Sequence, residues 1–303
     1  MLKIGIIGLG DIAGKAYLPV VSSRADVEVH LHTRNPEKLS RIGAQYRFLH
    51  LHPSLASLLE SGIKGAFVHG ATEAHAELVE QLLRRGIHVY VDKPITYDLA
   101  STKQLVTLAE TQGLVLMAGF NRRYAPAYQQ LRSLEAPNMV LMQKNRVAQP
   151  APIRTFVFDD FIHVADTLRY LFPYPVAELL VRGKVEDGLL YHVTVQMTAS
   201  NGATAIGIMN RDSGASEERV EVMSAGEKRM ALQVSDLVIR KGGDETRPGT
   251  SDWEPMLHKR GFEQIVEDFI QAVKTGQTPH VSAADALLTH ELCERIVGQL
   301  ERP

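Results

Sequence analysis

Two short segments of the chain carry the side chains best suited to acid–base chemistry. Asp92 and Lys93 end an apolar run, residues 87–91, and a proline follows them. Proline holds the residue before it out of the helical region, so the Lys93 ammonium can be aimed at a ligand. Farther along, Asp159 precedes His163 by four positions. On a helix the carboxylate would lie beside the imidazole, fix its tautomer and raise its basicity, as proton transfer requires.

The pattern of residues 158–171 predicts the helix that this pair needs. Asp160 and Asp166 would also neighbour His163 on it. The competing interpretation is an ordinary acidic helix start with a solvated histidine.

A metal site is not predicted, because no second cluster of ligands accompanies these acids. The pairs His30-x-His32 and His50-x-His52 lie on extended segments and are interpreted as incidental.

A glycine pattern near the start indicates a nucleotide site. Gly8-x-Gly10-x-x-Ala13 follows the apolar run of residues 4–7 and opens a helical pattern at Ile12. Gly8 permits the tight turn, Gly10 lets the backbone approach a pyrophosphate, and Ala13 lets helix and strand pack closely. The free N–H groups of the helix start then face the phosphates, so Gly8, Gly10, Asp11 and Ile12 are predicted to bind a dinucleotide.

The end of the second predicted strand bears on the choice of cofactor. NAD sites usually place an acid there for the ribose 2′-hydroxyl, but this chain has Thr33-Arg34-Asn35, with Lys38 nearby. Arg34 can bond a phosphate bidentately, and Thr33 and Asn35 can donate hydrogen bonds. These residues favour NADP as the cofactor, and NAD is the alternative. The competing interpretation of Arg34 is a solvated charge in a loop without a role in binding.

Alternating strands and helices position these groups. In the first 120 residues the patterns predict a parallel sheet covered on both faces. The predicted strands are residues 4–7, 27–31, 66–69, 87–91 and 114–117, and the predicted helices start at Ile12 or span residues 54–60, 73–85 and 99–111.

After Tyr124 the alternation gives way to consecutive strands, with turns such as Asn201-Gly202, which predict a mostly antiparallel sheet. The predicted strands are residues 139–147, 176–182, 189–199, 203–209, 219–224 and 230–234, and two closing helices are residues 261–274 and 283–300. The fold class is therefore α/β, with a dinucleotide-binding domain at residues 1–121 and an α+β domain with an open sheet at residues 122–303.

Composition narrows the class of protein. The 303 residues are 45% hydrophobic and 22% charged, enough for two ordinary domains. A formal net charge of −2 gives no bulk electrostatic attraction for nucleic acid or a membrane surface. The single cysteine, Cys293, excludes an intramolecular disulfide, and no stretch approaches the roughly 20 apolar residues of a membrane helix. We expect a cytoplasmic protein.

Five segments, in order, resemble the Gfo/Idh/MocA family of oxidoreductases, which includes glucose–fructose oxidoreductase and inositol dehydrogenase. They are GIIGLGDIAGKAYLP, TEAH, GIHVYVDKPI, MAGFNRRYAPAY and DDFIHVADTLRYL. The paired acids before the histidine are most similar to the MviM-like branch. The resemblance implies a Rossmann domain, a small sugar-like substrate, and a homodimer or homotetramer formed through the C-terminal sheet.

The resemblance also implies roles for single residues. In the family the lysine at the position of Lys93 contacts substrate and nicotinamide, and its bond to the proline is often cis. Asp159 and His163 fall where the D-x-G-x-H motif places its catalytic pair. Two departures are Asp92, where the family has glutamate, and Phe161, where it has glycine; Phe161 is expected to narrow the pocket or alter the helix entry.

Because the strands are parallel, the residues that follow them should meet at one edge of the sheet. The full set predicted to bind the cofactor is Gly8, Gly10, Asp11, Ile12, Thr33, Arg34, Asn35, Lys38, Gly70, His75, Asp92, Lys93, Asn121 and Arg122.

The expected function is an NADP-dependent dehydrogenase or reductase acting on a sugar, polyol or related hydroxyl compound. Lys93 would polarise the reacting oxygen, and His163, oriented by Asp159, would exchange the proton. Trp253 and His258, in the loop of residues 245–258, are candidates for the wall of the substrate pocket. The alternative is a regulator that senses NADP(H) and turns nothing over.

Overall fold

The computed structural model describes residues 1–249, 251 and 253–302 and forms two compact units. Unit 1 comprises Met1–Phe120 and Phe262–Leu288, and unit 2 comprises Asn121–Gly261 and Thr289–Pro303. Unit 2 begins at Asn121, and the late segment Phe262–Leu288 belongs to unit 1.

Unit 1 contains the predicted parallel sheet. Within Met1–Phe120, all of which is described, six parallel strands run in the order β3-β2-β1-β4-β5-β6. The strands are β1 (Leu2–Ile7), β2 (Val27–His32), β3 (His50–His52), β4 (Gly65–Val68), β5 (His88–Val91) and β6 (Leu116–Ala118). Reversal of the order at β1 and β4 creates the switch point at which such sheets bind ligands.

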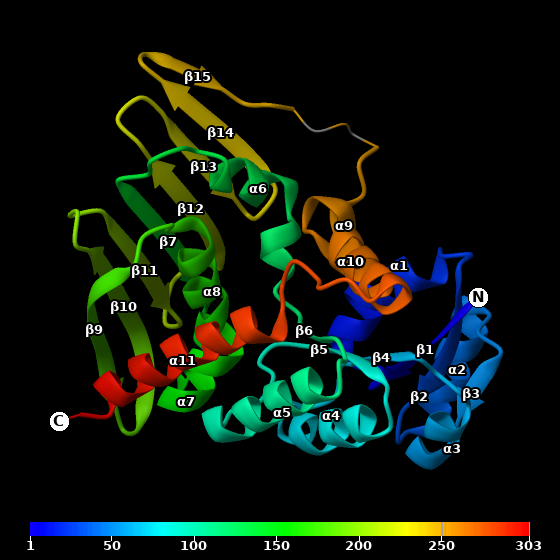
Figure 1. Cartoon of the computed structure of the whole chain (residues 1–303). Coiled ribbons are helices and arrows are strands. Elements are labelled where there is room, and N and C mark those ends of the chain that lie inside the picture. Colours follow the sequence, from blue (N-terminus) through cyan, green and yellow to red (C-terminus); the bar gives the residue numbers. More distant parts are fainter. Residues whose placement is uncertain (250, 252, 303) are drawn as a thin grey trace. The chain divides into compact units, whose positions relative to one another are not determined.

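Helices cover this sheet, and α4 and α5 lie side by side (Figure 1). The helices of unit 1 are α1 (Leu18–Ser22), α2 (Pro36–Tyr46), α3 (Leu55–Glu60), α4 (His75–Arg84), α5 (Leu99–Thr111), α10 (Phe262–Thr275) and the first part of α11 (Ala283–Leu300), with short turns η1 (Ala13–Tyr17) and η2 (Thr72–Ala74). Side-chain caps of these helices include Asn35, which accepts from Lys38 N at 2.9 Å, Ser54, which accepts from Ser57 N at 3.2 Å, and Asp98, which accepts from Ser101 N at 2.7 Å.

Aromatic packing explains why α10 belongs to unit 1. The ring of Phe269 lies 4.9 Å from that of Phe67 on β4 and 5.7 Å from that of Tyr90 on β5. Phe269 is fully buried, as are both partners. Its ring comes so close to β4 that a Cβ on Gly65 would lie 3.4 Å from it. A helix that follows the second domain in sequence therefore completes the core of the first.

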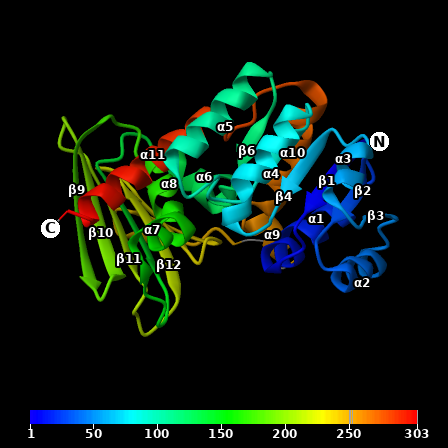
Figure 2. The same ribbon diagram turned by 90° about the horizontal axis from the view of Figure 1, so that it is seen from below.

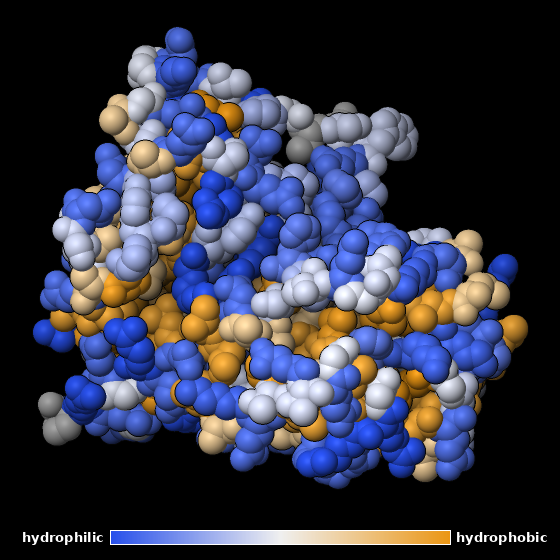
Figure 3. Space-filling view, viewed as in Figure 1, coloured by the Kyte–Doolittle hydropathy of each residue, from blue (hydrophilic) through white to orange (hydrophobic). Residues whose placement is uncertain are grey.

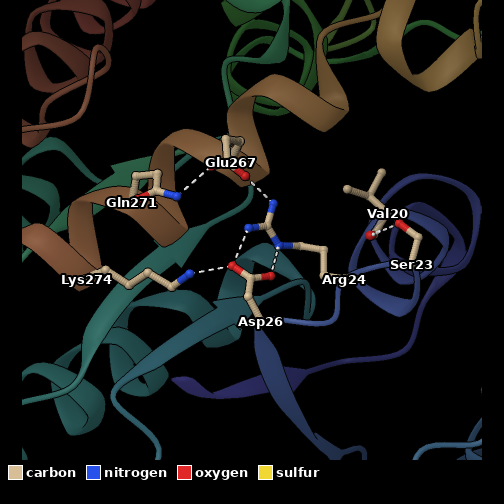
Figure 4. Close-up of polar contacts among 7 residues, drawn as sticks. All are labelled: Val20, Ser23, Arg24, Asp26, Glu267, Gln271 and Lys274. Atoms are coloured by element: carbon tan, nitrogen blue, oxygen red, sulfur yellow. Dashed lines mark hydrogen bonds and ion pairs between the residues drawn. The ribbon is translucent and has the colours of Figure 1, made fainter. Parts of the chain in front are cut away.

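An ion-pair cluster reinforces this packing (Figure 4). Arg24 bonds both carboxylate oxygens of Asp26, at 3.0 and 2.7 Å, and also pairs with Glu267 on α10. Lys274, on the same helix, pairs with Asp26, and Gln271 donates to Glu267 at 2.7 Å. Hydrogen bonds from Arg24 and Lys274 hold the pKa of Asp26 well below its usual value.

Unit 2 contains the predicted mostly antiparallel sheet. In the described part of the chain it has nine strands in the order β15-β14-β13-β12-β7-β11-β10-β8, with β9 also paired to β10. The pair β7–β11 is parallel. The strands are β7 (Met139–Asn145), β8 (Ala151–Pro152), β9 (Val176–Glu186), β10 (Leu189–Ala199), β11 (Thr204–Asn210), β12 (Glu217–Met223), β13 (Lys228–Leu232), β14 (Asp236–Lys241) and β15 (Asp244–Thr246).

Helices α7, α8 and the end of α11 lie along this sheet (Figure 2). The helical segments of unit 2 are η3 (Asn121–Tyr124), α6 (Pro126–Arg132), α7 (Ile153–Phe156), η4 (Val157–Phe161), α8 (Ile162–Leu171), α9 (Met256–Lys259) and the rest of α11. A Cβ on Gly207 would lie 2.7 Å from Val164 and 2.8 Å from Leu168, so glycine lets α8 approach β11 closely.

On the surface that Figure 3 shows, hydrophilic residues are interspersed with hydrophobic ones. No helix in the described part of the chain combines the length and hydropathy that crossing a bilayer requires.

Candidate functional site

The turn after β1 requires glycine at position 8. Gly8 has φ +85°, and a Cβ there would lie 2.7 Å from the backbone nitrogen of Gly70 and 2.8 Å from the carbonyl carbon of His69. The Gly8 N–H donates to the carbonyl of His32 at 3.0 Å. Loops after β1, β2 and β4 therefore meet at this turn. The helix that follows includes a π-helical turn, Ala13–Tyr17, a feature often found at functional sites.

These loops enclose a cavity of about 690 Å³ at the carboxyl edge of the sheet. Six of the residues predicted to bind the cofactor line it: Gly8, Gly10, Thr33, Arg34, Lys38 and Gly70. The glycine turn and the helix start are the parts that the pyrophosphate of a dinucleotide needs, and the cations after β2 suit the 2′-phosphate that NADP adds. The residues present therefore fit NAD or NADP.

Two predicted cofactor residues have other contacts. The exposed Asp11 carboxylate accepts from Lys15 at 2.8 Å. The Asn35 side-chain oxygen caps α2, which leaves its amide N–H groups as the donors for a ligand. Ile12 lies half-buried at the start of the helix.

His69 also lines the cavity, and sequence reasoning missed it as a site residue. It is 4% exposed, and neither ring nitrogen has a hydrogen-bond partner within the described part of the chain. Burial lowers the pKa of His69 to about 3, so the ring is neutral at pH 7. Its ring centroid lies 4.0 Å from that of Tyr17, whose hydroxyl bonds that of Tyr90 at 2.6 Å. The sequence feature that could have identified His69 is its position as a polar residue directly after the buried apolar strand β4.

The Lys93 loop is fixed by its neighbours. The Lys93 N–H donates to the Asp92 carboxylate at 2.9 Å, and the Lys93–Pro94 peptide bond is cis. His75, which was predicted to bind the cofactor, is buried and donates from Nδ1 to the Pro94 carbonyl at 3.0 Å. Its Nε2 lies 3.2 Å from the carbonyl oxygen of Gly70. Burial raises the pKa of the Asp92 carboxyl.

In unit 2, Asp159 and His163 lie where a π-helical turn, Val157–Phe161, joins α8. The wide turn replaces the uniform helix predicted for residues 158–171. His163 is 8% exposed. Phe161 is fully buried, and its ring lies near Gly207 of β11, so this departure from the family motif fills the core of unit 2.

Asp160 and Asp166 have partners that the helical spacing did not predict. Asp160 pairs with Lys144 and also accepts from Arg146 at 2.9 Å. Asp166 accepts from Arg123 at 2.9 and 2.5 Å and from Thr289 at 2.9 Å. Although burial opposes ionisation, Lys144 and Arg146 hold the pKa of Asp160 well below its usual value.

A second buried cluster engages the GFNRR segment. Arg122 makes a bidentate ion pair with Glu218 at 2.6 and 2.7 Å, and Tyr128 donates to the same carboxylate at 2.7 Å. Burial alone would raise the pKa of Glu218, but Arg122 brings it down to about 2. Asn121 donates to the carbonyl of Arg260 at 2.9 Å. Arg122 and Asn121, predicted to bind the cofactor, thus have their side chains bonded within unit 2.

Lys144 belongs to the same interior and is a further residue that sequence reasoning missed. It is 2% exposed, and burial followed by the charge of Arg122 lowers its pKa. Arg211, half-buried beside Phe156, has Nε and Nη1 without a partner in the described part of the chain. The burial of Lys144 could have been predicted from the sequence, because every second residue of β7, beginning with Val140 and Met142, faces the interior.

The predicted pocket wall is only partly described. Trp253 is 93% exposed, and His258 pairs with Glu254 at 3.4 Å. Thr250 and Asp252, in the same loop, lie outside the described residues.

Comparison with known proteins agrees with this arrangement. Residues 2–120 match a family model described as an oxidoreductase family with an NAD-binding Rossmann fold, and residues 126–242 match the YceM-like C-terminal domain. The chain is 31% identical over 302 residues to YceM of Salmonella typhimurium, covering 97% of both chains. It is 24% identical over 321 residues to inositol 2-dehydrogenase of Rhizobium meliloti, covering 98% of this chain and 96% of the relative.

The fold has a close match among solved structures. The dehydrogenase MviM of Clostridium difficile superimposes with a TM-score of 0.93 at 30% identity, over 98% of this chain and 99% of the other. Two matching domain models and a full-length relative establish the assignment. The chain belongs to the Gfo/Idh/MocA family of oxidoreductases, with an NAD-binding Rossmann fold.

Proposed function

We propose that the protein is an NADP-dependent dehydrogenase or reductase acting on a sugar, polyol or related hydroxyl compound. The observation that carries the proposal is the cavity at the carboxyl edge of the unit 1 sheet, which is lined by Gly8 and Gly10 and also by Thr33, Arg34 and Lys38. An arginine and a lysine at the end of β2 suit a 2′-phosphate, because they supply charge-assisted hydrogen bonds. When bound, the cofactor supplies a nicotinamide that gives or takes a hydride.

Lys93 is proposed to donate a hydrogen bond to the reacting oxygen of the substrate. Hydrogen bonds from Lys93 N to Asp92 and from His75 to Pro94 hold the backbone on both sides of its Cα. A backbone held in this way lowers the cost of placing the ammonium. The charge would stabilise the negative charge that develops on the oxygen during the reaction.

His163 is proposed to exchange the substrate proton, with Asp159 as the residue that orients it. The pair lies at a π-helical turn, and neighbouring acids are already neutralised by cations. Asp159 is proposed for the role because it precedes His163 by four residues, the spacing of neighbours along a helix. A carboxylate beside an imidazole fixes its tautomer and supports its protonated form.

The substrate class rests on two kinds of support. One relative is named an inositol 2-dehydrogenase, which acts on a polyol. In addition, unit 2 holds three cationic side chains. Lys144 lies on β7, Arg146 directly follows β7, and Arg211 directly follows β11. Such donors suit an oxygen-rich substrate. The uncovered face of the unit 2 sheet is proposed to form a homodimer or homotetramer.

The test is a screen of sugars and polyols with NADP+, followed by Lys93→Ala and His163→Ala. Each variant should lower kcat by about 10²–10⁴-fold, while NADPH binding is retained. Lys64→Ala, at an exposed position, is the control and should keep full activity. Unchanged turnover in folded Lys93→Ala or His163→Ala would reject the assigned roles.

The alternative is a regulator that binds NADP(H) without turnover. Retention of Lys93, Asp159 and His163 favours the enzyme, because a sensor needs none of the three. A protein that binds NADPH, turns over no compound in the screen, and captures a heteropartner with NADPH-dependent affinity would support the sensor instead.

A further inference from the structure

The two histidine pairs that the sequence left without a role come together at the edge of the unit 1 sheet. β2 and β3 are parallel neighbours, and the register pairs His30 with His50 and His32 with His52. Because side chains alternate along a strand, Glu28 lies on the same face of β2 as His30. A cluster of imidazole nitrogens and a carboxylate therefore forms from two strands whose paired histidines are 20 positions apart in the sequence.

We propose that Glu28, His30 and His50 form a binding site for a divalent first-row transition metal of the zinc class. Their ligand atoms all lie within 4.8 Å of one another. The Nε2 atom of His30 lies 2.9 Å from Oε1 of Glu28, and Nε2 of His50 lies 3.7 Å from it. Two ligands bonded tetrahedrally to zinc at about 2.1 Å are about 3.4 Å apart, so a small adjustment suffices.

The kind of ligand selects the kind of cation. Two imidazoles and one carboxylate suit zinc, nickel or copper, whereas magnesium and calcium prefer oxygen ligands. The His30 side chain is 3% exposed, but those of Glu28 and His50 are 26% and 44% exposed, so an ion can reach the site from solvent.

Residues behind the site can orient its buried ligand. Nδ1 of His30 lies 2.9 Å from Nε2 of His52, and Nδ1 of His52 lies 2.9 Å from the hydroxyl of Ser57. Without a cation, His30 can donate from Nε2 to Glu28 and accept at Nδ1 from His52. With a cation between Nε2 and Glu28, His30 can instead donate from Nδ1 to His52, and His52 from Nδ1 to Ser57, so that Nε2 of His30 presents its lone pair to the cation. Metal-binding histidines are usually held by such a second hydrogen bond.

The ammonium of Lys3 competes with a bound cation for the carboxylate of Glu28. Its ammonium lies 3.4 Å from Oε1 of Glu28, and its side chain is 44% exposed. An exposed lysine can swing away when a cation binds, but its charge opposes that cation. Replacing Lys3 by glutamine should therefore strengthen metal binding, whereas a purely structural cluster of hydrogen bonds would show no such gain.

The proposal does not depend on the proposed function, and its test needs no activity. Tag-free, chelator-treated full-length protein is titrated with ZnCl₂ by calorimetry, and separately with MgCl₂. We expect one zinc equivalent and no magnesium binding. His50→Gln and Glu28→Gln should each weaken zinc binding by at least about tenfold, and Lys3→Gln should strengthen it. The control His192→Gln, on β10 of unit 2, should match the wild type.

Thermal unfolding without metal establishes that each variant is folded. Zinc binding that is absent in the wild type, or that His50→Gln and Glu28→Gln leave unchanged, would overturn the proposal and leave the cluster as a set of hydrogen bonds.

Discussion

Nδ1 of His75 donates a hydrogen bond to the carbonyl oxygen of Pro94 at 3.0 Å, which ties the first turn of α4 to the loop that carries Lys93. Nε2 of the same ring lies 3.2 Å from the carbonyl oxygen of Gly70. One buried side chain thus connects the loops after β4 and β5, one of which lines the cavity. We interpret His75 as a positioning residue for Lys93.

His75→Ala should therefore lower kcat by about 10²-fold, because displacement of a catalytic group by about 1 Å costs that much. Loss of the bond to a buried carbonyl should also reduce the free energy of unfolding by about 1–3 kcal/mol. His75→Asn, which keeps a donor, should recover part of kcat. Steady-state kinetics and urea unfolding measure both effects. A variant that loses stability but keeps full kcat would show that His75 supports the fold alone.

Gly8→Ala should destabilise unit 1 and abolish dinucleotide binding. The added Cβ would lie 2.7 Å from the Gly70 nitrogen, and the positive φ alone costs an alanine about 1–2 kcal/mol. Gly14→Ala is the matched control, because a Cβ there meets no atom within 4 Å. Thermal unfolding with and without NADPH compares them. Equal NADPH stabilisation of the two variants would contradict the assigned turn.

Arg34→Ala should weaken NADPH binding by about tenfold or more while changing NADH binding little. A hydrogen bond to a charged group contributes about 1.5–3 kcal/mol, and only NADPH offers the 2′-phosphate. Arg41→Ala, an exposed arginine on α2, serves as the control. Fluorescence titration with both nucleotides gives the affinities. Equal losses for NADPH and NADH would place Arg34 elsewhere on the nucleotide.

Stability should fall in acid as Glu218 is protonated. Its pKa is about 2 in the fold against a usual value of 4.5, so the carboxylate stabilises the fold above pH 4.5. That contribution is lost as the pH falls from 4.5 toward 2, because the unfolded chain binds the proton first. Glu218→Gln should flatten this part of the profile and, by leaving Arg122 buried without its partner, cost about 3–5 kcal/mol at pH 7.

Urea unfolding between pH 2 and pH 7 measures the Glu218 effect. Glu178→Gln, at an exposed position on β9, is the control and should stay within about 0.5 kcal/mol of the wild type. A Glu218→Gln profile that keeps the wild-type slope would reject the linkage.

Much of unit 1 was predictable, because its signals are local. Buried apolar runs such as Ile4–Ile7 and the glycine turn at Gly8 specify strand, turn and helix from neighbouring residues alone. The parallel sheet and the family were confirmed. Membership of α10 in unit 1 was not predictable, because the contacts of Phe269 with Phe67 and Tyr90 join residues about 200 positions apart.

The site was predictable where function depends on backbone geometry and less so where it depends on packing. Gly8, Gly10 and Arg34 line one cavity, and their binding of a cofactor stays a prediction. Helical spacing placed Asp160 and Asp166 beside His163, but Lys144 on β7 and Arg123 on η3 hold their carboxylates. Ion pairs between residues far apart in the sequence are not indicated by any local sequence pattern.

Thermal unfolding with NADPH and with NADH tests the central claim most directly. At 100 times its dissociation constant a ligand adds about 2.7 kcal/mol of stability, which a rise in Tm makes visible. Protein shown to carry no bound nucleotide should be stabilised by both, and more by NADPH. A larger shift with NADH would overturn the NADP assignment, and no shift with either would contradict the account of the Gly8–Arg34 cavity as a dinucleotide site.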